Sequence, residues 1–96
     1  MKVTEKIEIM KPEEIEVEFD LGEILNNWDL SKNRMDRARE ALERITDYPG
    51  VVWRLLERNN LIETEKQEVG HGSKEHFVFI TGKGKDEMAK NRLGIS

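Results

Sequence analysis

The sequence predicts a single α+β domain, and three features of its apolar pattern predict it. The N-terminus alternates apolar and charged residues, which is the period of a β-strand. The middle of the chain repeats apolar side chains at helical spacing, and two extended runs around a glycine-rich tip follow it. Ninety-six residues suffice for one hydrophobic core. We expect one domain over residues 1–96, with N-terminal strands in 1–19, a helical core in 20–60, a hairpin in 61–81 and a C-terminal helix in 82–96.

Composition excludes several classes of function. The chain contains no cysteine, so it has neither a disulfide framework nor a thiolate metal site. No apolar run approaches the ~18 residues of a membrane helix. The opening MKVTEKIEIM carries glutamates where a signal peptide requires apolar residues. We therefore expect a soluble protein of the cytoplasm.

The net charge of −4 is unevenly distributed along the chain. Residues 1–30 hold three lysines and nine carboxylates, whereas residues 31–96 hold thirteen basic and eleven acidic residues. The acidity is therefore local, and a basic face can coexist with an acidic flank.

Two strands, Lys6–Met10 and Glu14–Phe19, are predicted first. Their odd-numbered apolar residues fall on one face, and the even-numbered carboxylates of the second strand fall on the other. Lys11-Pro12-Glu13 interrupts the alternation, so the segment is either a hairpin or one bent arm. An isolated two-stranded element is marginally stable, so its apolar face needs cover, either from a second copy of the chain or from the chain's own helices.

The period changes at Asp20, which can cap a first helix together with Glu23. A second helix is expected from Asn33 to Ile45, with Ser31 or Asn33 as its cap. A third helix is expected over residues 48–59. It has Asp47 as a candidate cap, Pro49 in its first turn and Asn60 as a left-handed stop. Two helices joined by so short a turn form a helix-turn-helix pattern.

Glycines and lysines at residues 82–85 raise the possibility of a phosphate-binding loop, which the neighbouring residues exclude. A P-loop requires Ser or Thr where Asp86 stands. The dinucleotide fingerprint requires a glycine where Glu87 stands, and a carboxylate there would repel a pyrophosphate. The glycines are therefore assigned to a turn, and Thr81 to the cap of a final helix from Lys83 to about Leu93.

From Pro49 onward, PGVVWRLLERNNLIETEKQEVGHGSKEHFVFITGKGKDEM resembles part of the winged helix-turn-helix transcription regulators of the MarR and PadR types. The similar part is their recognition helix, wing and following helix, and it spans roughly half the chain. Asn59-Asn60 departs from the usual Glu-x-Gly. The residues that match are Leu55, Leu56, Leu61, Ile62, Val78, Ile80, Thr81, Lys83 and Gly84. The resemblance implies a winged helix-turn-helix fold, a three-helix core plus a β-hairpin wing, here with an extra N-terminal β element and a C-terminal helix.

The resemblance also implies a function, sequence-specific binding of double-stranded DNA by a homodimeric transcription regulator. Helix 48–59 would enter the major groove with Val52, Leu55 and Leu56 on its inner face. Arg54 is the candidate for reading a guanine and Arg58 for meeting a phosphate. The outward residues expected to lie at the DNA are Tyr48, Gly50, Val51, Arg54 and Arg58.

The glycine-tipped hairpin, residues 70–74, would be the wing beside the minor groove. We expect contacts there from His71 or Lys74, and the small side chain of Ser73 lets the backbone approach. Lys83 either meets backbone phosphate near the wing or is simply solvated. The simpler interpretation of residues 70–74 is an ordinary flexible loop.

Other readings of the same residues remain open. Arg54 and Arg58 can instead pair with Glu57 or a neighbouring acid on a solvated face. The rival function is a winged-helix adaptor for protein–protein interaction, with the acidic strand Glu14–Asp20 as its docking surface. Nothing in the pattern predicts an enzyme, a cofactor or a small-molecule ligand, because no nucleophile stands beside a base. His71 and His76 alone leave a metal site incomplete.

Overall fold

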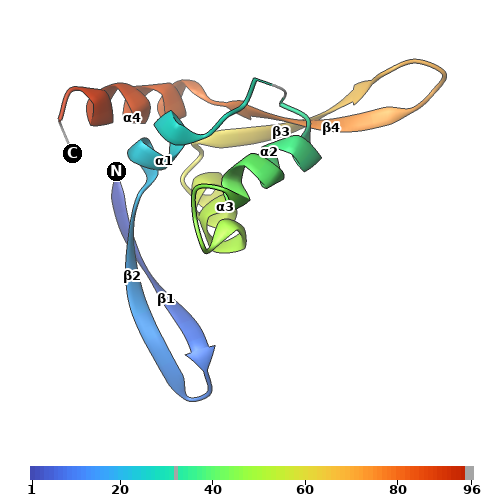
Figure 1. Ribbon diagram of the computed structural model, residues 1–96. Coiled ribbons are helices and arrows are strands. Elements are labelled where there is room, and N and C mark those ends of the chain that lie inside the picture. Colours follow the sequence, from blue (N-terminus) through green and yellow to red (C-terminus); the bar gives the residue numbers. More distant parts are fainter. Residues whose placement is uncertain (32, 95–96) are drawn as a thin grey trace.

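The computed structural model describes residues 1–31 and 33–94 as an α+β fold, in agreement with the predicted class. The described residues form four helices and two antiparallel sheets of two strands each. The two hairpins project from the helical body in different directions (Figure 1). In chain order the elements are β1 (Lys2–Met10), β2 (Glu13–Asp20), α1 (Leu21–Asn27), α2 (Met35–Glu43), α3 (Pro49–Arg58), β3 (Ile62–Glu68), β4 (Lys74–Ile80) and α4 (Gly82–Arg92).

The strands β1 and β2 form a hairpin, here called the N-terminal ribbon, rather than one bent arm. It begins four residues earlier than the alternating pattern predicts. The register pairs Val3 with Phe19 and Ile7 with Ile15, which places the apolar residues of both strands on one face. Phe19 at the base is only 6% exposed, whereas Ile15 is 37% and Ile9 61% exposed. The helical body therefore covers the apolar face at its base and leaves it open toward the tip.

The hydrophobic core lies between α1, α2, α3 and the base of the β3–β4 hairpin. Trp28 and Trp53 meet edge to face in it with their ring centroids 5.7 Å apart. The indole N–H of Trp28 donates to the carbonyl oxygen of Ala38 at 2.8 Å, so α1 and α2 are also joined by a buried hydrogen bond. The largest fully buried side chains are Leu21, Leu25, Leu42, Leu56, Leu61, Val52 and Val78.

The start of α2 differs from the prediction. The helix begins at Met35, and Arg34 precedes it without a side-chain cap, so the expected cap from Ser31 or Asn33 was wrong. The reason is a long-range contact. The carbonyl of Asn33 accepts the N–H of Val78 at 2.8 Å, and Arg34 forms a bridge with Phe77. These two residues are therefore held extended beside β4 instead of entering the helix.

The ends of α3 follow the local signals in part. Pro49 occupies the first helical position, and Asn60 has a φ of 58°, as its left-handed stop requires. Asp47 does not cap the helix. The residue before the helix is Tyr48, whose N–H donates to the hydroxyl of Thr46 at 3.2 Å.

The glycines at residues 82–85 belong to a turn and a close approach. Thr81 caps α4, because its hydroxyl accepts the N–H of Gly84 at 3.0 Å. A Cβ on Gly84 would lie 2.3 Å from the carbonyl oxygen of Leu61, so only glycine lets α4 pass this close to the start of β3. No helix of the described chain is long and apolar enough to cross a membrane.

Candidate nucleic-acid interface

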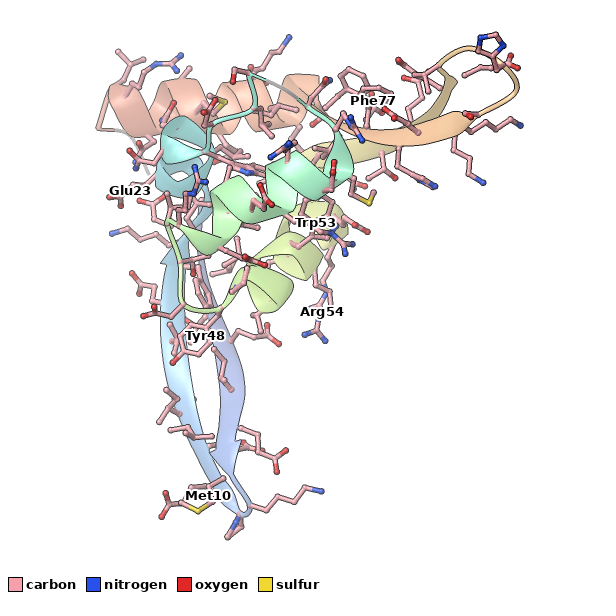
Figure 2. The ribbon with its side chains drawn as sticks, turned by 45° about the vertical axis from the view of Figure 1, so that its right-hand side comes forward. Met10, Glu23, Tyr48, Trp53, Arg54 and Phe77 are labelled. Atoms are coloured by element: carbon pink, nitrogen blue, oxygen red, sulfur yellow. The ribbon has the colours of Figure 1, made fainter. Side chains whose placement is uncertain are left out.

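The outward face of α3 is centred on Arg54. Val52, Leu55 and Leu56 are buried, as predicted, and Trp53 is nearly so. At about 100° per residue, this burial turns Gly50, Arg54 and Glu57 toward solvent. Arg54 extends away from the helical body, on the side between the two hairpins (Figure 2).

Arg54 and Arg58 differ in their surroundings. Within residues 1–31 and 33–94, no carboxylate lies within 4.0 Å of Arg54. Glu57, the expected alternative partner, accepts a hydrogen bond from the indole N–H of Trp53 instead. Arg58 has its Nη1 atom 3.8 Å from Oε2 of Glu5 on β1. The cation at the centre of the face is therefore available to a ligand, and the one at its edge is shared with the ribbon.

Arg39 of α2 lies between α3 and the β3–β4 hairpin, on a surface that also carries Glu43, Asp36 and Glu75. Its guanidinium carbon lies 5.1 Å from the ring centroid of Trp53, within cation–π range. Arg39 lines a hollow of about 270 Å³ beside the start of α3, together with Gly50 and Trp53. It also lines a second hollow, of about 380 Å³, which reaches Glu75 and His76 on β4. One surface thus runs from the first turn of α3, past Arg39, to the hairpin.

Sequence reasoning missed Arg39. Its position immediately after Ala38 and four residues after Met35 places it at the edge of the apolar stripe of α2. That position could have identified Arg39 from the sequence. A long basic side chain at the edge of a buried apolar stripe lies beside the element that packs against the stripe.

The β3–β4 hairpin carries its basic residues on one face. Cross-strand pairs share a face, and the register pairs Thr64 with Val78, Lys66 with His76 and Glu68 with Lys74. Because Val78 is buried in the core, the face that carries these pairs is the one that the hairpin turns toward the helical body at its base. The opposite face carries Glu63 and Glu65 beside Phe79 and Phe77.

The tip of this hairpin is a closed turn. Gly70, His71 and Gly72 all have positive φ, of 85°, 48° and 76°. The N–H of Val69 donates to the carbonyl of Ser73 at 2.9 Å, and the N–H of Ser73 donates back to Gly70 at 3.0 Å. His71 and Ser73 therefore stand at the tip on an ordered backbone, and Lys74 is exposed where β4 begins.

The remaining predicted residues lie at different distances from this surface. Gly50 is exposed beside Arg39. Tyr48 is half-buried, with its ring 6.2 Å from that of Phe19 in an edge-to-face contact. Val51 is partly buried against the core. Lys83 is exposed in the first turn of α4, at the opposite end of β4 from the hairpin tip. The structure thus brings Gly50 and Arg39 together, places Arg54 one turn along α3 from Gly50, and separates Lys83 from the tip residues.

The net charge of the protein resides in the ribbon. Residues 1–20 hold three lysines and seven carboxylates, a net −4, whereas residues 21–96 hold thirteen basic and thirteen acidic residues. The ribbon contacts both ends of α3. Phe19 packs against Tyr48, the residue before the helix, and Glu5 pairs with Arg58 in the last turn of the helix. An acidic element therefore borders one side of the outward face of α3.

Within residues 1–31 and 33–94, no three histidine or carboxylate side chains are grouped so that they could hold a metal ion. No protein-family model, curated protein or solved structure matches the chain.

Proposed function

We propose that the chain is a winged helix-turn-helix domain that binds double-stranded DNA as a transcription regulator. The observation that carries the proposal is the outward face of α3, where Arg54 stands exposed and without an ion-pair partner among the described residues. The order of elements supports it. Three helices are followed by a projecting hairpin, β3–β4, in the position of a wing, and residues 33–34 bridge to β4 between the first two helices.

The chemistry of duplex DNA fits this face. A major groove about 12 Å wide admits one helix, and side chains near the helix start reach the base edges. Gly50 has nothing within 4 Å of where a Cβ would stand, so the start of α3 is open to a backbone. A guanidinium such as that of Arg54 meets guanine O6 and N7 in a fork worth ~1 to 3 kcal/mol of discrimination.

Other cations of the surface would meet phosphate. Arg39 lies between α3 and the wing, where the backbone of an inserted duplex would pass. Lys66 and Lys74 share the wing face that turns toward the helices at its base, together with His76 and Glu68. Contacts of this kind fix the protein on the duplex and make binding depend on salt.

A homodimer would read two half-sites about one helical turn apart. The tip of the N-terminal ribbon offers the surface for such pairing, because Ile9, Met10 and Ile15 are exposed there. Sedimentation equilibrium at tens of micromolar protein tests this part. A dimer that Ile9→Ser/Ile15→Ser converts to a monomer supports pairing through the ribbon, and a wild-type monomer excludes it.

The DNA proposal is tested by the fluorescence anisotropy of a labelled random-sequence duplex, titrated at several salt concentrations. Wild-type affinity should fall log-linearly with salt as counterions are released. Arg54→Ala/Lys74→Ala should weaken binding about fivefold at low salt and make the salt slope shallower by about 1 to 2. Arg37→Ala/Lys90→Ala removes the same charge from surfaces away from α3 and should change affinity less than about twofold.

The second candidate function is a protein-interaction adaptor. The observation in its favour is the ribbon, which combines the whole net charge of the protein with exposed apolar residues at its tip. The same titration separates the two candidates. Absence of duplex binding at the lowest salt, both by the wild type and after the acidic residues of the ribbon are neutralised, would remove the DNA proposal and favour the adaptor.

A further inference from the structure

We propose that the N-terminal ribbon acts as an acidic barrier beside α3 that lowers the affinity of the domain for any duplex. Sequence-independent binding is then weaker, and contacts with the bases supply a larger share of the affinity. The inference rests on the proposed DNA-binding function and names the element that would limit the affinity for DNA of any sequence. Three observations carry it, namely the position of the ribbon, its charge and its length.

The position follows from the helical wheel of α3. With Arg54 at the centre, Tyr48 and Arg58 fall on one side, and Gly50, Trp53 and Glu57 fall on the other. The ribbon contacts the first side through the Phe19–Tyr48 and Glu5–Arg58 pairs. Arg39 and the hollow that it lines contact the second side. The outward face of α3 is therefore flanked by the hollow that Arg39 lines on one side and by the ribbon on the other. Figure 2 shows Arg54 on the side of α3 from which the ribbon extends.

The ribbon carries seven carboxylates and three lysines, and two of the lysines stand opposite carboxylates across the strands, Lys6 opposite Glu16 and Lys2 opposite Asp20. Glu14, Glu16 and Glu18 share the solvent face of β2 and are exposed. None of them has a cation within 4.0 Å among the described residues. Glu14 stands opposite Glu8 across the strands, so like charges face each other at this position.

The length of the ribbon keeps these charges near an inserted duplex. The eight residues of β2 at about 3.4 Å each make the ribbon roughly 27 Å long. It leaves the helical body near α1 and extends past α3 (Figure 1). Glu14, Glu16 and Glu18 lie on the face of the ribbon opposite to the one that meets α3, so they would act on the flanking phosphates through space and not by contact. Such a repulsion between separated charges is screened least at low salt.

The physical consequence is a repulsion of the phosphate backbone that does not depend on the DNA sequence. Contacts with the phosphate backbone supply essentially all of non-specific binding. A fixed repulsion lowers that affinity for every duplex alike, whereas the base contacts of Arg54 are made only at particular sequences. At a given salt concentration the ribbon therefore raises the number of base contacts that binding needs.

The test compares two variants with equal charge changes. Glu14→Gln/Glu16→Gln/Glu18→Gln neutralises the ribbon, and Glu23→Gln/Glu40→Gln/Asp86→Asn neutralises three exposed carboxylates on α1, α2 and α4. Affinity for a random-sequence duplex is measured by anisotropy between about 50 and 200 mM salt. The ribbon variant should bind about fivefold tighter at the lowest salt, with the gain shrinking as salt rises, and the control within about twofold of wild type.

A second ribbon variant guards against altered folding. Glu8→Gln/Glu14→Gln removes two like charges that face each other, so it relieves a repulsion within the ribbon. It should also tighten duplex binding at low salt, and circular dichroism should show an unchanged melting temperature or a higher one. Tighter binding by both ribbon variants, with little change in the control, supports the inference.

The outcomes separate this inference from the DNA proposal. If wild type and both ribbon variants bind the duplex equally well, the barrier is refuted and DNA binding stands. A wild type that binds only after neutralisation of the ribbon supports both ideas. If the wild type and every variant fail to bind at the lowest salt, both ideas are refuted.

Discussion

The two hairpins of this protein are alike in topology and differ in how their exposed halves are built. In the β3–β4 hairpin the apolar pattern on the inner face stops at Val78, and the pairs beyond it are polar or charged. In the N-terminal ribbon the apolar pattern continues to Ile9, well beyond the part that the helices cover. The outer half of the β3–β4 hairpin is therefore mostly polar, with Val69 as its exposed apolar side chain at the tip, whereas the ribbon exposes Ile9, Met10 and Ile15.

The anchoring of the two hairpins also differs. The β3–β4 hairpin is held by the extended residues 33–34 on one side and by the capped start of α4 on the other. The ribbon is held near its base, where Phe19 enters the core, the Met1 amino group meets Glu87 of α4, and Glu5 pairs with Arg58. Its tip extends beyond these contacts, with Ile9 and Met10 exposed.

The largest expected effect comes from cutting the anchor of the ribbon. Phe19→Ala removes a core side chain and should lower the free energy of unfolding by about 3 to 5 kcal/mol, measured by urea denaturation. Ile9→Ala is its matched control at the tip and should cost less than about 0.5 kcal/mol, because Ile9 is mostly exposed. Equal losses at the two positions would mean that the tip is covered in solution.

The anchor of the other hairpin depends on Gly84. Gly84→Ala places a Cβ against the backbone carbonyl of Leu61, so α4 must shift, and we expect a loss of about 2 kcal/mol in stability. Gly82→Ala is the control in the same turn, because nothing lies within 4 Å of a Cβ there. It should change stability by less than about 0.5 kcal/mol. Thermal melts of the two variants would contradict the close approach if they coincided.

A smaller effect concerns the joint between the ribbon and α4. In a chain whose Met1 carries a free amino group, this group donates to Oε2 of Glu87 at 2.9 Å. This hydrogen bond lowers the pKa of the Glu87 carboxyl below its ordinary value near 4.5, although burial acts in the opposite direction. Because the folded-state pKa is depressed, the stabilisation is present above about pH 4.5 and is lost as pH falls through the lowered pKa.

Glu87→Gln tests this joint without a change in size. The variant should lose about 1 to 2 kcal/mol near neutral pH, and the difference from wild type should shrink as the pH falls below about 4. Urea denaturation at a series of pH values measures it. A constant difference at every pH would show that the loss is one of packing and not of charge.

The sequence predicted most of what depends on neighbouring residues. Asp20 and Thr81 cap their helices, and Pro49 and Asn60 mark the ends of α3, because each acts on backbone groups within a few positions. The predicted start of α2 was wrong because the carbonyl of Asn33 accepts a hydrogen bond from Val78, which lies far along the chain. Local propensity contains no information about such a contact.

The arrangement around α3 was predicted less fully for the same reason. The burial of Val52 and the exposure of Arg54 follow from helical periodicity alone. The place of the ribbon along α3 does not, because alternation shows that a face is apolar and says nothing of what covers it. The position of Arg39 over Trp53 does not follow from periodicity either, because it depends on how α2 and α3 cross.

Thr81 joins three elements at one residue. Its hydroxyl donates to the carbonyl of Asn60 at 2.6 Å and accepts from Gly84, while its backbone N–H donates to the carbonyl of Leu61 at 3.0 Å. The incoming end of β3 and the outgoing end of β4 are thus clamped together at the first turn of α4. If the glycine turn at the hairpin tip were displaced, these hydrogen bonds would keep the two strand ends together. The hairpin would then move as one unit and shift the first turn of α4 with it.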